Sequence, residues 1–238
     1  MELFDLHSHV LPKIDDGARD SDVSAAMLRE AAEQGVVLMA ATPHYYSKHR
    51  SISDFLAARK TSFDSLMEKI RLQNAVCPKI CLGAEVYLSR GLSVRDDLES
   101  LCYEGTNVIL VELPYEQWGN WVYREIEQLI ADRALKVVLA HPERYVVMPW
   151  DIKKLQPFFE MRTILQINAD GILEQRRVVG KLLESGCPCV LGSDTHDLKE
   201  RRSRIGQAAE RLRHIYGEKQ LVRMQNLVET KWGLQVEK

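Results

Sequence analysis

Short apolar runs alternate with amphipathic helical stretches along the whole of this 238-residue sequence. Several runs are apolar at consecutive positions and rich in β-branched residues, as residues 108–111 and 137–140 show. Strands that are buried on both faces of a parallel sheet have this composition, and the helices between them serve as crossovers. The pattern predicts seven strands, at residues 2–7, 36–42, 79–87, 107–113, 136–141, 163–168 and 188–193.

Helical patterns fill the intervals between the predicted strands. The first helix is expected to begin at residue 23 behind Asp20 and Ser21, which are capping residue types, and to close at Gly35. Further helices are predicted at residues 53–73, 121–133, 175–185, 199–216 and 219–231. No Pro/Gly/Ser-rich linker or low-complexity segment divides the sequence, which predicts a single domain over residues 1–238.

Seven strand-helix units can remain an open doubly wound sheet or close into a barrel, and periodicity does not decide between the two. Histidines and carboxylates follow the ends of nearly all the predicted strands. Closure brings the carboxyl ends of all strands around one mouth, whereas an open sheet would scatter some of these side chains. The sequence therefore favours an α/β fold closed as a (β/α)7 barrel of the TIM type.

The ligand-type side chains have the spacing of a metal site. His7 and His9 share one face of an extended chain, as do Asp194 and His196 after the last predicted strand. Imidazole and carboxylate donors without a thiolate suit Mn²⁺, Fe²⁺ or Zn²⁺. The candidate ligands are too many for one ion and predict two or three: His7, His9, Asp16, His44, Glu85, Glu112, His141, Asp194 and His196.

Charge and hydropathy exclude several classes of protein. Lys+Arg total 32 and Asp+Glu total 34, a net charge of -2, so no basic surface for nucleic acid is expected. No run approaches the roughly 18 apolar residues of a membrane span, and the first residues lack a basic and then apolar signal segment. We expect a cytoplasmic protein without membrane insertion.

The cysteines argue against a thiolate phosphatase. There are five, an odd number without a CxxC pair, which suits free thiols in a reducing compartment. A cysteine phosphatase needs an arginine six positions after its nucleophile to hold the phosphate. None of the five cysteines has one, so the thiolate mechanism in that form is absent.

Seven short segments occur in a specific order between residues 5 and 201. They are Asp5-Leu6-His7-Ser8-His9, Asp15-Asp16-Gly17, Ala41-Thr42-Pro43-His44, Gly83-Ala84-Glu85, Glu112-Leu113-Pro114, His141-Pro142-Glu143-Arg144 and Ser193-Asp194-Thr195-His196. These segments resemble the polymerase-and-histidinol-phosphatase (PHP) superfamily. Within it they are most similar to the protein-tyrosine phosphatases of capsule and exopolysaccharide biosynthesis, the CpsB/CapC type.

The resemblance implies a distorted seven-unit barrel, a trinuclear site that usually works with manganese, and dephosphorylation of a bacterial tyrosine autokinase in the cytoplasm. It places ligands around three ions: His7, His9, Glu85 and Asp194 on the first, Glu85, Glu112 and His141 on the second, and Asp16, His44 and His196 on the third. Arg144 and Arg201 match the arginines that grip the phosphate. Relatives carry Arg-Pro-Pro where this chain has Arg201-Arg202-Ser203, so either Arg201 or Arg202 can point inward.

Other functions compete with the tyrosine phosphatase. A histidinol-phosphate phosphatase, or another small-molecule phosphomonoesterase, needs a deeper pocket, whereas Glu112 at the end of strand four and the compact length favour the phosphotyrosine substrate. A PHP nuclease accompanies a polymerase and a basic groove, neither of which this sequence shows. A non-catalytic regulator would have to retain costly buried carboxylates and imidazoles without metal. Asp15, Asp197 and His49 are candidate proton relays, and the oligomeric state stays open.

Overall fold

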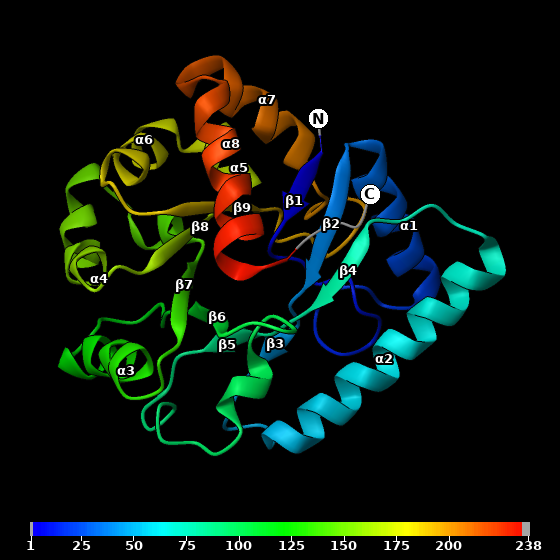
Figure 1. Ribbon diagram of the computed structural model, residues 1–238, viewed down its shortest axis with the longest axis horizontal. Coiled ribbons are helices and arrows are strands. Elements are labelled where there is room, and N and C mark those ends of the chain that lie inside the picture. Colours follow the sequence, from blue (N-terminus) through cyan, green and yellow to red (C-terminus); the bar gives the residue numbers. More distant parts are fainter. Residues whose placement is uncertain (1, 235–238) are drawn as a thin grey trace.

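The computed structural model describes residues 2–234 and arranges them as an α/β fold in which every strand pairing is parallel (Figure 1). One sheet has the order β1 (Leu3–Asp5), β2 (Val36–Ala41) and β4 (Lys79–Leu82). The second has the order β3 (His44–Tyr45), β5 (Glu85–Tyr87), β6 (Val108–Glu112), β7 (Lys136–Ala140), β8 (Ile164–Asn168) and β9 (Cys189–Gly192). All seven predicted strands are confirmed in this part of the chain.

The predicted strand at residues 79–87 is observed as two strands, β4 and β5. The break is local, because the amide of Gly83 donates to Ala41 O (2.9 Å) and the amide of Glu85 donates to Pro43 O (3.0 Å). Pro43 has no amide hydrogen and cannot continue the ladder itself. The same break divides β2 from β3, so the site-bearing residues His44 and Glu85 begin new short strands.

At the other edge, the chains that follow β1 and β9 run side by side. Leu6 N donates to Leu191 O (3.0 Å), Asp194 N donates to His7 O (2.8 Å), and Ser8 and Thr195 form a single parallel bridge. A continuous ladder would require extended backbone, and Asp194 has a left-handed φ of 54°. The described strands therefore form two parallel sheets, and no closed barrel is detected among them.

Helices surround the strands, with α2 along one side and α3 on the opposite side (Figure 1). Their bounds are α1 Ser21–Glu33, α2 Ile52–Gln73, α3 Asn120–Ala131, α4 Gln156–Glu160, α5 Ala169–Glu174, α6 Arg176–Glu184, α7 Ile205–Tyr216 and α8 Glu218–Leu227. Asp20 caps α1 by accepting a hydrogen bond from Val23 N (2.9 Å), as its residue type predicts. No helix within residues 2–234 has the length and apolar character needed to cross a membrane.

Two helix predictions need correction, and several short elements were not predicted. The predicted helix 199–216 begins only at Ile205, because Asp197 accepts hydrogen bonds from Lys199 N (2.6 Å) and Arg201 N (3.2 Å) and holds a loop. The last predicted helix ends as α8 at Leu227 and continues as a π-helical turn, Val228–Trp232. The short helices α4 and α5 were not predicted, and neither were the 3₁₀ turns η1 (Leu98–Leu101), η2 (Pro142–Tyr145) and η3 (Pro149–Leu155).

Candidate metal centre

All nine predicted ligands converge at the carboxyl-terminal side of the strands. They reach it from separate elements: His7 and His9 follow β1, His44 begins β3, Glu85 begins β5, Glu112 ends β6, His141 follows β7, and Asp194 and His196 follow β9, while Asp16 comes from the loop before α1. Seven of the nine are buried. The side chain of His44 is 15% exposed and that of Asp16 is 61% exposed, so the cluster opens to solvent on their side.

Four buried side chains form the innermost group, and each offers one atom within 4.8 Å of the others. The Nε2 atoms of His7 and His9 lie 3.2 Å apart. Glu85 Oε2 lies 3.3 Å from the first nitrogen and 3.2 Å from the second, and Asp194 Oδ1 lies 3.4 Å and 3.3 Å from them. These are the four residues that the family resemblance assigns to one ion.

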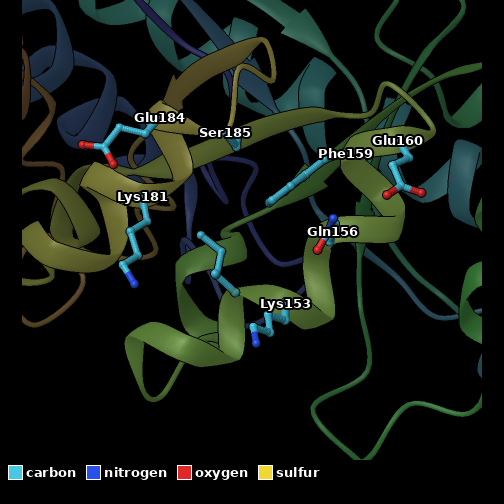
Figure 2. A pocket seen from close by; sticks show the side chains of 8 residues that line it. Lys153, Gln156, Phe159, Glu160, Lys181, Glu184 and Ser185 are labelled. Carbon is cyan, nitrogen blue, oxygen red and sulfur yellow. The ribbon is translucent and has the colours of Figure 1, made fainter.

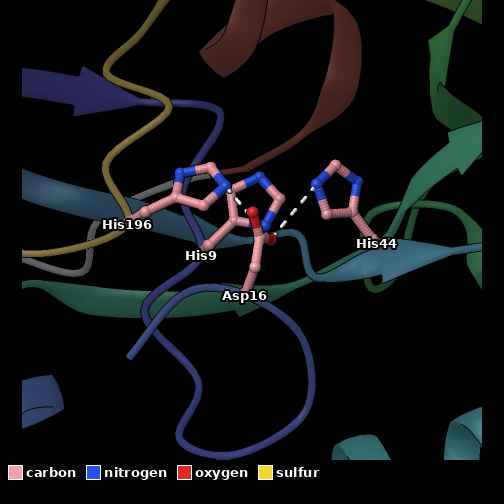
Figure 3. Close-up of side chains that lie close together, drawn as sticks. All are labelled: His9, Asp16, His44 and His196. Carbon is pink, nitrogen blue, oxygen red and sulfur yellow. Dashed lines mark ion pairs between the residues drawn. The ribbon is translucent and has the colours of Figure 1, made fainter. Parts of the chain in front are cut away.

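A second group lies nearer the solvent and contains His9, Asp16, His44 and His196. Figure 3 shows the carboxylate of Asp16 between the imidazoles of His44 and His196. Asp16 Oδ1 is 3.5 Å from His44 Nε2 and 3.4 Å from His196 Nε2. The ring of His9 stacks on that of His196 with centroids 3.8 Å apart. The structure thus adds His9 to the three residues predicted for this position.

The third group contains His44, Glu85 and Glu112. His141 adjoins it, because its Nε2 lies 2.9 Å from Glu85 Oε1 and 3.8 Å from Glu112 Oε1. Glu85 therefore belongs to two groups and also touches His141. It has two carboxylate oxygens in separate surroundings, which suits a bridge between neighbouring ions.

The chemistry of these residues fits divalent metal ions. Glu85 Oε2, His44 Nδ1 and His196 Nε2 are buried and make no hydrogen bond, although Glu85 Oε2 lies 2.9 Å from His44 Nδ1 and His196 Nε2 lies 3.4 Å from Asp16 Oδ1 as ion pairs. Buried polar atoms that make no hydrogen bond are costly, and all three side chains belong to the ligand groups described above, which indicates a ligand. The donors are imidazoles and carboxylates without a thiolate, the set that suits Mn²⁺, Fe²⁺ and Zn²⁺.

The pKa values of side chains in the cluster also fit a bound divalent cation. Burial raises the pKa of Glu112 to about 7, and the charge of Glu85 adds to that rise. Burial also lowers the pKa of His196 to about 4, which keeps the lone pair of its imidazole free. Burial acts to lower the pKa of His7, but Glu85 and Asp194 outweigh it and raise that pKa. A divalent cation can supply the positive charge that a proton on His7 brings to these carboxylates.

Both predicted arginines reach the cluster. Arg144, in η2 after β7, pairs through Nη2 with Asp194 Oδ2. Arg201 Nη2 lies 3.3 Å from the same oxygen, and its Nη1 lies 3.3 Å from Asp16 Oδ2. Arg202 instead places Nε 3.8 Å from Glu30 Oε1 on α1. The structure therefore turns Arg201 inward and Arg202 away.

Two candidate proton relays have other contacts. Asp15 Oδ2 accepts hydrogen bonds from His9 Nδ1 (2.7 Å) and His44 N (3.0 Å), so this carboxylate orients His9. Burial acts to raise the pKa of Asp15, but the contact with His9 outweighs it and lowers the pKa to about 2. Asp197 holds the loop before α7, as described above. His49 remains at the rim, where it lines a hollow with Asp16, His44 and Tyr46.

The sequence did not identify Gln166, which holds several candidate ligands from behind. Gln166 is fully buried in β8, and its Oε1 accepts hydrogen bonds from His7 Nδ1 (2.7 Å) and His141 N (3.1 Å). Its Nε2 donates to Asn168 Oδ1 (2.7 Å), and Asn168 Nδ2 donates to Asp194 Oδ2 (3.2 Å). A polar residue inside the apolar run Ile164–Asn168 was the available signal.

We expect Gln166→Leu to weaken metal binding by about 10- to 100-fold, the usual cost of losing a side chain that orients a ligand. The leucine cannot accept the proton of His7 Nδ1, so the ring loses the tautomer that presents Nε2 to the cluster. Metal dissociation constants from equilibrium dialysis provide the measurement. Gln34→Leu is the matched control, because Gln34 bonds Ser203 O and Gly206 N instead. Equal metal affinities for both variants would contradict the role of Gln166.

A separate hollow of about 510 Å³ lies between η3, α4 and α6 (Figure 2). Its lining includes Lys153, Phe159, Glu160, Lys181 and Glu184. None of the nine candidate ligands and neither inward arginine lines it. This hollow is therefore separate from the candidate metal centre at the strand ends.

The fold and the site together define a parallel α/β protein with a candidate multinuclear metal centre and two arginines beside it. The family model described as capsular polysaccharide synthesis, CpsB/CapC, matches residues 3–229, and the chain belongs to this family. The resemblance drawn from the sequence motifs is thereby confirmed.

Several characterised proteins are similar to this chain over most of its length. The tyrosine-protein phosphatase YwqE of Bacillus subtilis (strain 168) is 29% identical over 226 residues, which cover 90% of this chain and 85% of YwqE. The tyrosine-protein phosphatase CpsB of Streptococcus pneumoniae is 25% identical over 238 residues, which cover 91% of this chain and 92% of CpsB.

Solved structures share the fold. A crystal structure from the work on YwqE and CpsB, described as unique metal-dependent tyrosine phosphatases, superposes with a TM-score of 0.77 at 24% identity and covers 94% of this chain and 91% of its own. A phosphotriesterase homology protein from Escherichia coli, complexed with phosphate, has a TM-score of 0.55 at 10% identity and covers 94% of both chains.

Proposed function

We propose that this chain is a metal-dependent protein-tyrosine phosphatase that hydrolyses phosphotyrosine monoesters. The observation that carries the proposal is the convergence of nine candidate imidazole and carboxylate ligands with Arg144 and Arg201 at one end of the strands. The names of the relatives YwqE and CpsB support the same reaction. Its substrate would be a phosphorylated bacterial tyrosine autokinase that controls capsule or exopolysaccharide synthesis.

The residues of the site divide the work of phosphate hydrolysis. Divalent ions held by the nine ligands would supply Lewis-acid polarisation of the phosphoryl oxygens and activation of water. Arg144 and Arg201 both form ion pairs with Asp194 Oδ2, so their guanidinium groups are adjacent at the cluster. Together they can donate hydrogen bonds to two phosphate oxygens. Asp15 accepts a hydrogen bond from His9, and Gln166 accepts one from His7. These bonds orient the two imidazoles and keep the candidate ligands in one geometry.

We propose manganese as the physiological metal, with Fe²⁺, Zn²⁺ and Co²⁺ as other ions that the ligand set accepts. Three overlapping groups of ligands support two or three ions per chain. Elemental analysis of protein loaded with Mn²⁺ is expected to give that ratio. One ion or fewer per chain in fully loaded protein would contradict the multinuclear centre.

We also propose that the chain is one PHP-type domain, residues 1–238, whose two sheets act as a distorted (β/α)7 barrel. Seven strand units support this, with β2 and β3 as one unit and β4 and β5 as another. The hydrogen bonds between the chains after β1 and β9 support a ring. The proposed bounds at residue 1 and residues 235–238 lie outside the described part of the chain.

The proposed reaction takes place in the cytoplasm. All five cysteines are free thiols in the structure, which suits a reducing compartment. The proposal includes no nucleic-acid partner and no membrane insertion, consistent with the net charge of -2 and the sequence patterns described above.

A substrate panel tests the proposal against its competitors. A phosphotyrosine peptide, histidinol phosphate and single-stranded DNA are each incubated with the purified protein, with Mn²⁺ and with a chelator. We expect hydrolysis of the peptide only, abolished by the chelator. Preference for histidinol phosphate would indicate the alternative small-molecule phosphomonoesterase, DNA cleavage a nuclease, and no turnover with metal a non-catalytic regulator.

A further inference from the structure

Two hollows in the surface meet at Arg144, and Val147 lines both. The first has a volume of about 520 Å³ and an aromatic lining that includes Tyr115, Trp118 and Tyr145. The second has a volume of about 600 Å³ and a lining that includes Arg176 and Arg177. A phosphate held at Arg144 would therefore lie beside two different surfaces.

The aromatic hollow has fixed walls. The hydroxyl of Tyr145 donates to Leu113 O and accepts from Leu113 N, both at 2.9 Å. The ring of Trp118 packs edge-on against Tyr145 with centroids 5.4 Å apart, and its Nε1 donates to Pro114 O (2.7 Å). An apolar side chain that enters this hollow meets a wall that needs little reorganisation.

Exposed apolar surface adjoins this wall. Tyr115 is 60% exposed and stands 5.5 Å from Tyr145 between ring centroids, and Val147 is 81% exposed. Met148 and Trp150, in the chain just after Val147, are also exposed. Apolar side chains grouped beside a charged site are characteristic of surfaces that another molecule covers.

The second hollow is lined by three arginines, Arg144, Arg176 and Arg177, and by Glu143 and Glu174. Arg176 and Arg177 begin α6, are exposed, and form no ion pair with any residue between 2 and 234. The nearest acidic residue along the chain, Glu174, is instead paired with Arg204 at 2.6 Å. Two free guanidinium groups beside Arg144 complement acidic side chains of a bound chain.

We infer that these two hollows bind the peptide on either side of a phosphotyrosine. An apolar residue on one side of the phosphotyrosine occupies the aromatic hollow, and an acidic residue on the other side contacts Arg176 and Arg177. The inference rests on the proposed tyrosine phosphatase function and adds the sequence class of its substrate. A small phosphomonoester is too short to contact both hollows that meet at Arg144.

The charged side is tested with the double variant Arg176→Glu/Arg177→Glu. Two phosphotyrosine peptides are compared, one with acidic residues near the phosphotyrosine and one with alanines there, together with a small aryl phosphate. In the wild type we expect kcat/KM to favour the acidic peptide by about tenfold, the size expected of two exposed ion pairs. The double variant should lose that preference and keep its rate on the aryl phosphate.

The matched control changes the same charge elsewhere. Arg211 on α7 and Lys219 on α8 are exposed and line neither hollow, so Arg211→Glu/Lys219→Glu should keep the preference for the acidic peptide. Loss of the preference in both double variants would mean that net charge alone attracts the peptide, which overturns the assignment to Arg176 and Arg177.

The apolar side is tested with Val147→Ser, and with Val94→Ser as its control because Val94 is 74% exposed and lines neither hollow. We expect Val147→Ser to lower kcat/KM about threefold for a peptide with an apolar residue beside the phosphotyrosine, in proportion to the apolar area lost. Light scattering is measured on the same samples. A change in self-association without a change in peptide hydrolysis would assign this surface to a second copy of the chain and overturn the inference.

The wild-type results separate the two levels of proposal. Hydrolysis of the aryl phosphate and of both peptides at equal kcat/KM would leave the phosphatase function intact and overturn the inference about flanking residues. No hydrolysis of the aryl phosphate with Mn²⁺ present would overturn the phosphatase function itself.

Discussion

Glu85→Ala is expected to lower kcat/KM for a phosphotyrosine peptide by at least about 10³-fold. Glu85 is fully buried and its two oxygens lie between 2.9 and 3.3 Å from nitrogens of His7, His9, His44 and His141. Its removal therefore disturbs ligands from all three groups at once. Metal ions lower the activation free energy of such reactions by several kcal/mol, and about 1.36 kcal/mol corresponds to a factor of ten in rate.

The control is a variant in which all five cysteines are replaced with serine, and it should keep its activity. Burial raises the pKa of Cys81 to about 11 and the pKa values of Cys102 and Cys189 to about 12, so these thiols stay protonated near neutral pH. Circular dichroism must show that both variants are folded at the assay temperature. Activity lost without the cysteines and retained in Glu85→Ala would reverse the mechanism.

The strands were predictable because each is a short apolar run, and burial on both faces leaves that pattern in the sequence. β6, β8 and β9 are buried at every position. The break between β4 and β5 was not predictable in this way, because Gly83 and Ala84 are as compatible with a strand as with its interruption. The start of α7 depends on contacts of the Asp197 carboxylate with backbone amides, which periodicity does not record.

The grouping of the nine candidate ligands was anticipated from their place at strand ends, and their role as ligands remains a prediction. The sequence could not show that Arg201, and not Arg202, points toward the cluster, because the two residues are identical and adjacent. The loop between His196 and α7 sets the directions of their side chains. Gln166 was missed because it lies at mid-strand behind the site. Its role depends on His7 and His141, which are distant in sequence and meet it only after folding.

Phosphotyrosine is expected to be hydrolysed at least about 100-fold faster than phosphoserine in matched peptides. General acid catalysis contributes about 10² to 10⁴ in rate, so its absence penalises the poorer leaving group. Tyrosine has a pKa of about 10, whereas an aliphatic hydroxyl lies nearer the value of about 15.7 for water. The phenolate oxygen can carry the charge that develops as the phosphorus–oxygen bond breaks, and the serine alkoxide cannot.

The contacts of the candidate proton donors support this expectation. Asp15 accepts hydrogen bonds from His9 and from the amide of His44, and Asp197 accepts them from the amides of Lys199 and Arg201. Both carboxylates are thus engaged as acceptors and do not offer a proton to a leaving oxygen. Asp15 and His49 both line the hollow shared with Asp16 and His44, and of these two Asp15 is already engaged as an acceptor.

The measurement is kcat/KM for peptides that differ only in the phosphorylated residue, at saturating Mn²⁺, extended to aryl phosphates of graded leaving-group pKa. The rate should fall steadily as the leaving-group pKa rises, provided that bond breaking limits the reaction. Equal rates for the tyrosine and serine peptides, with no dependence on leaving-group pKa, would require a general acid at the rim. In that case the His49→Gln variant should regain a rate that depends on leaving-group pKa. If the rate of this variant is still independent of leaving-group pKa, Asp197 becomes the candidate general acid.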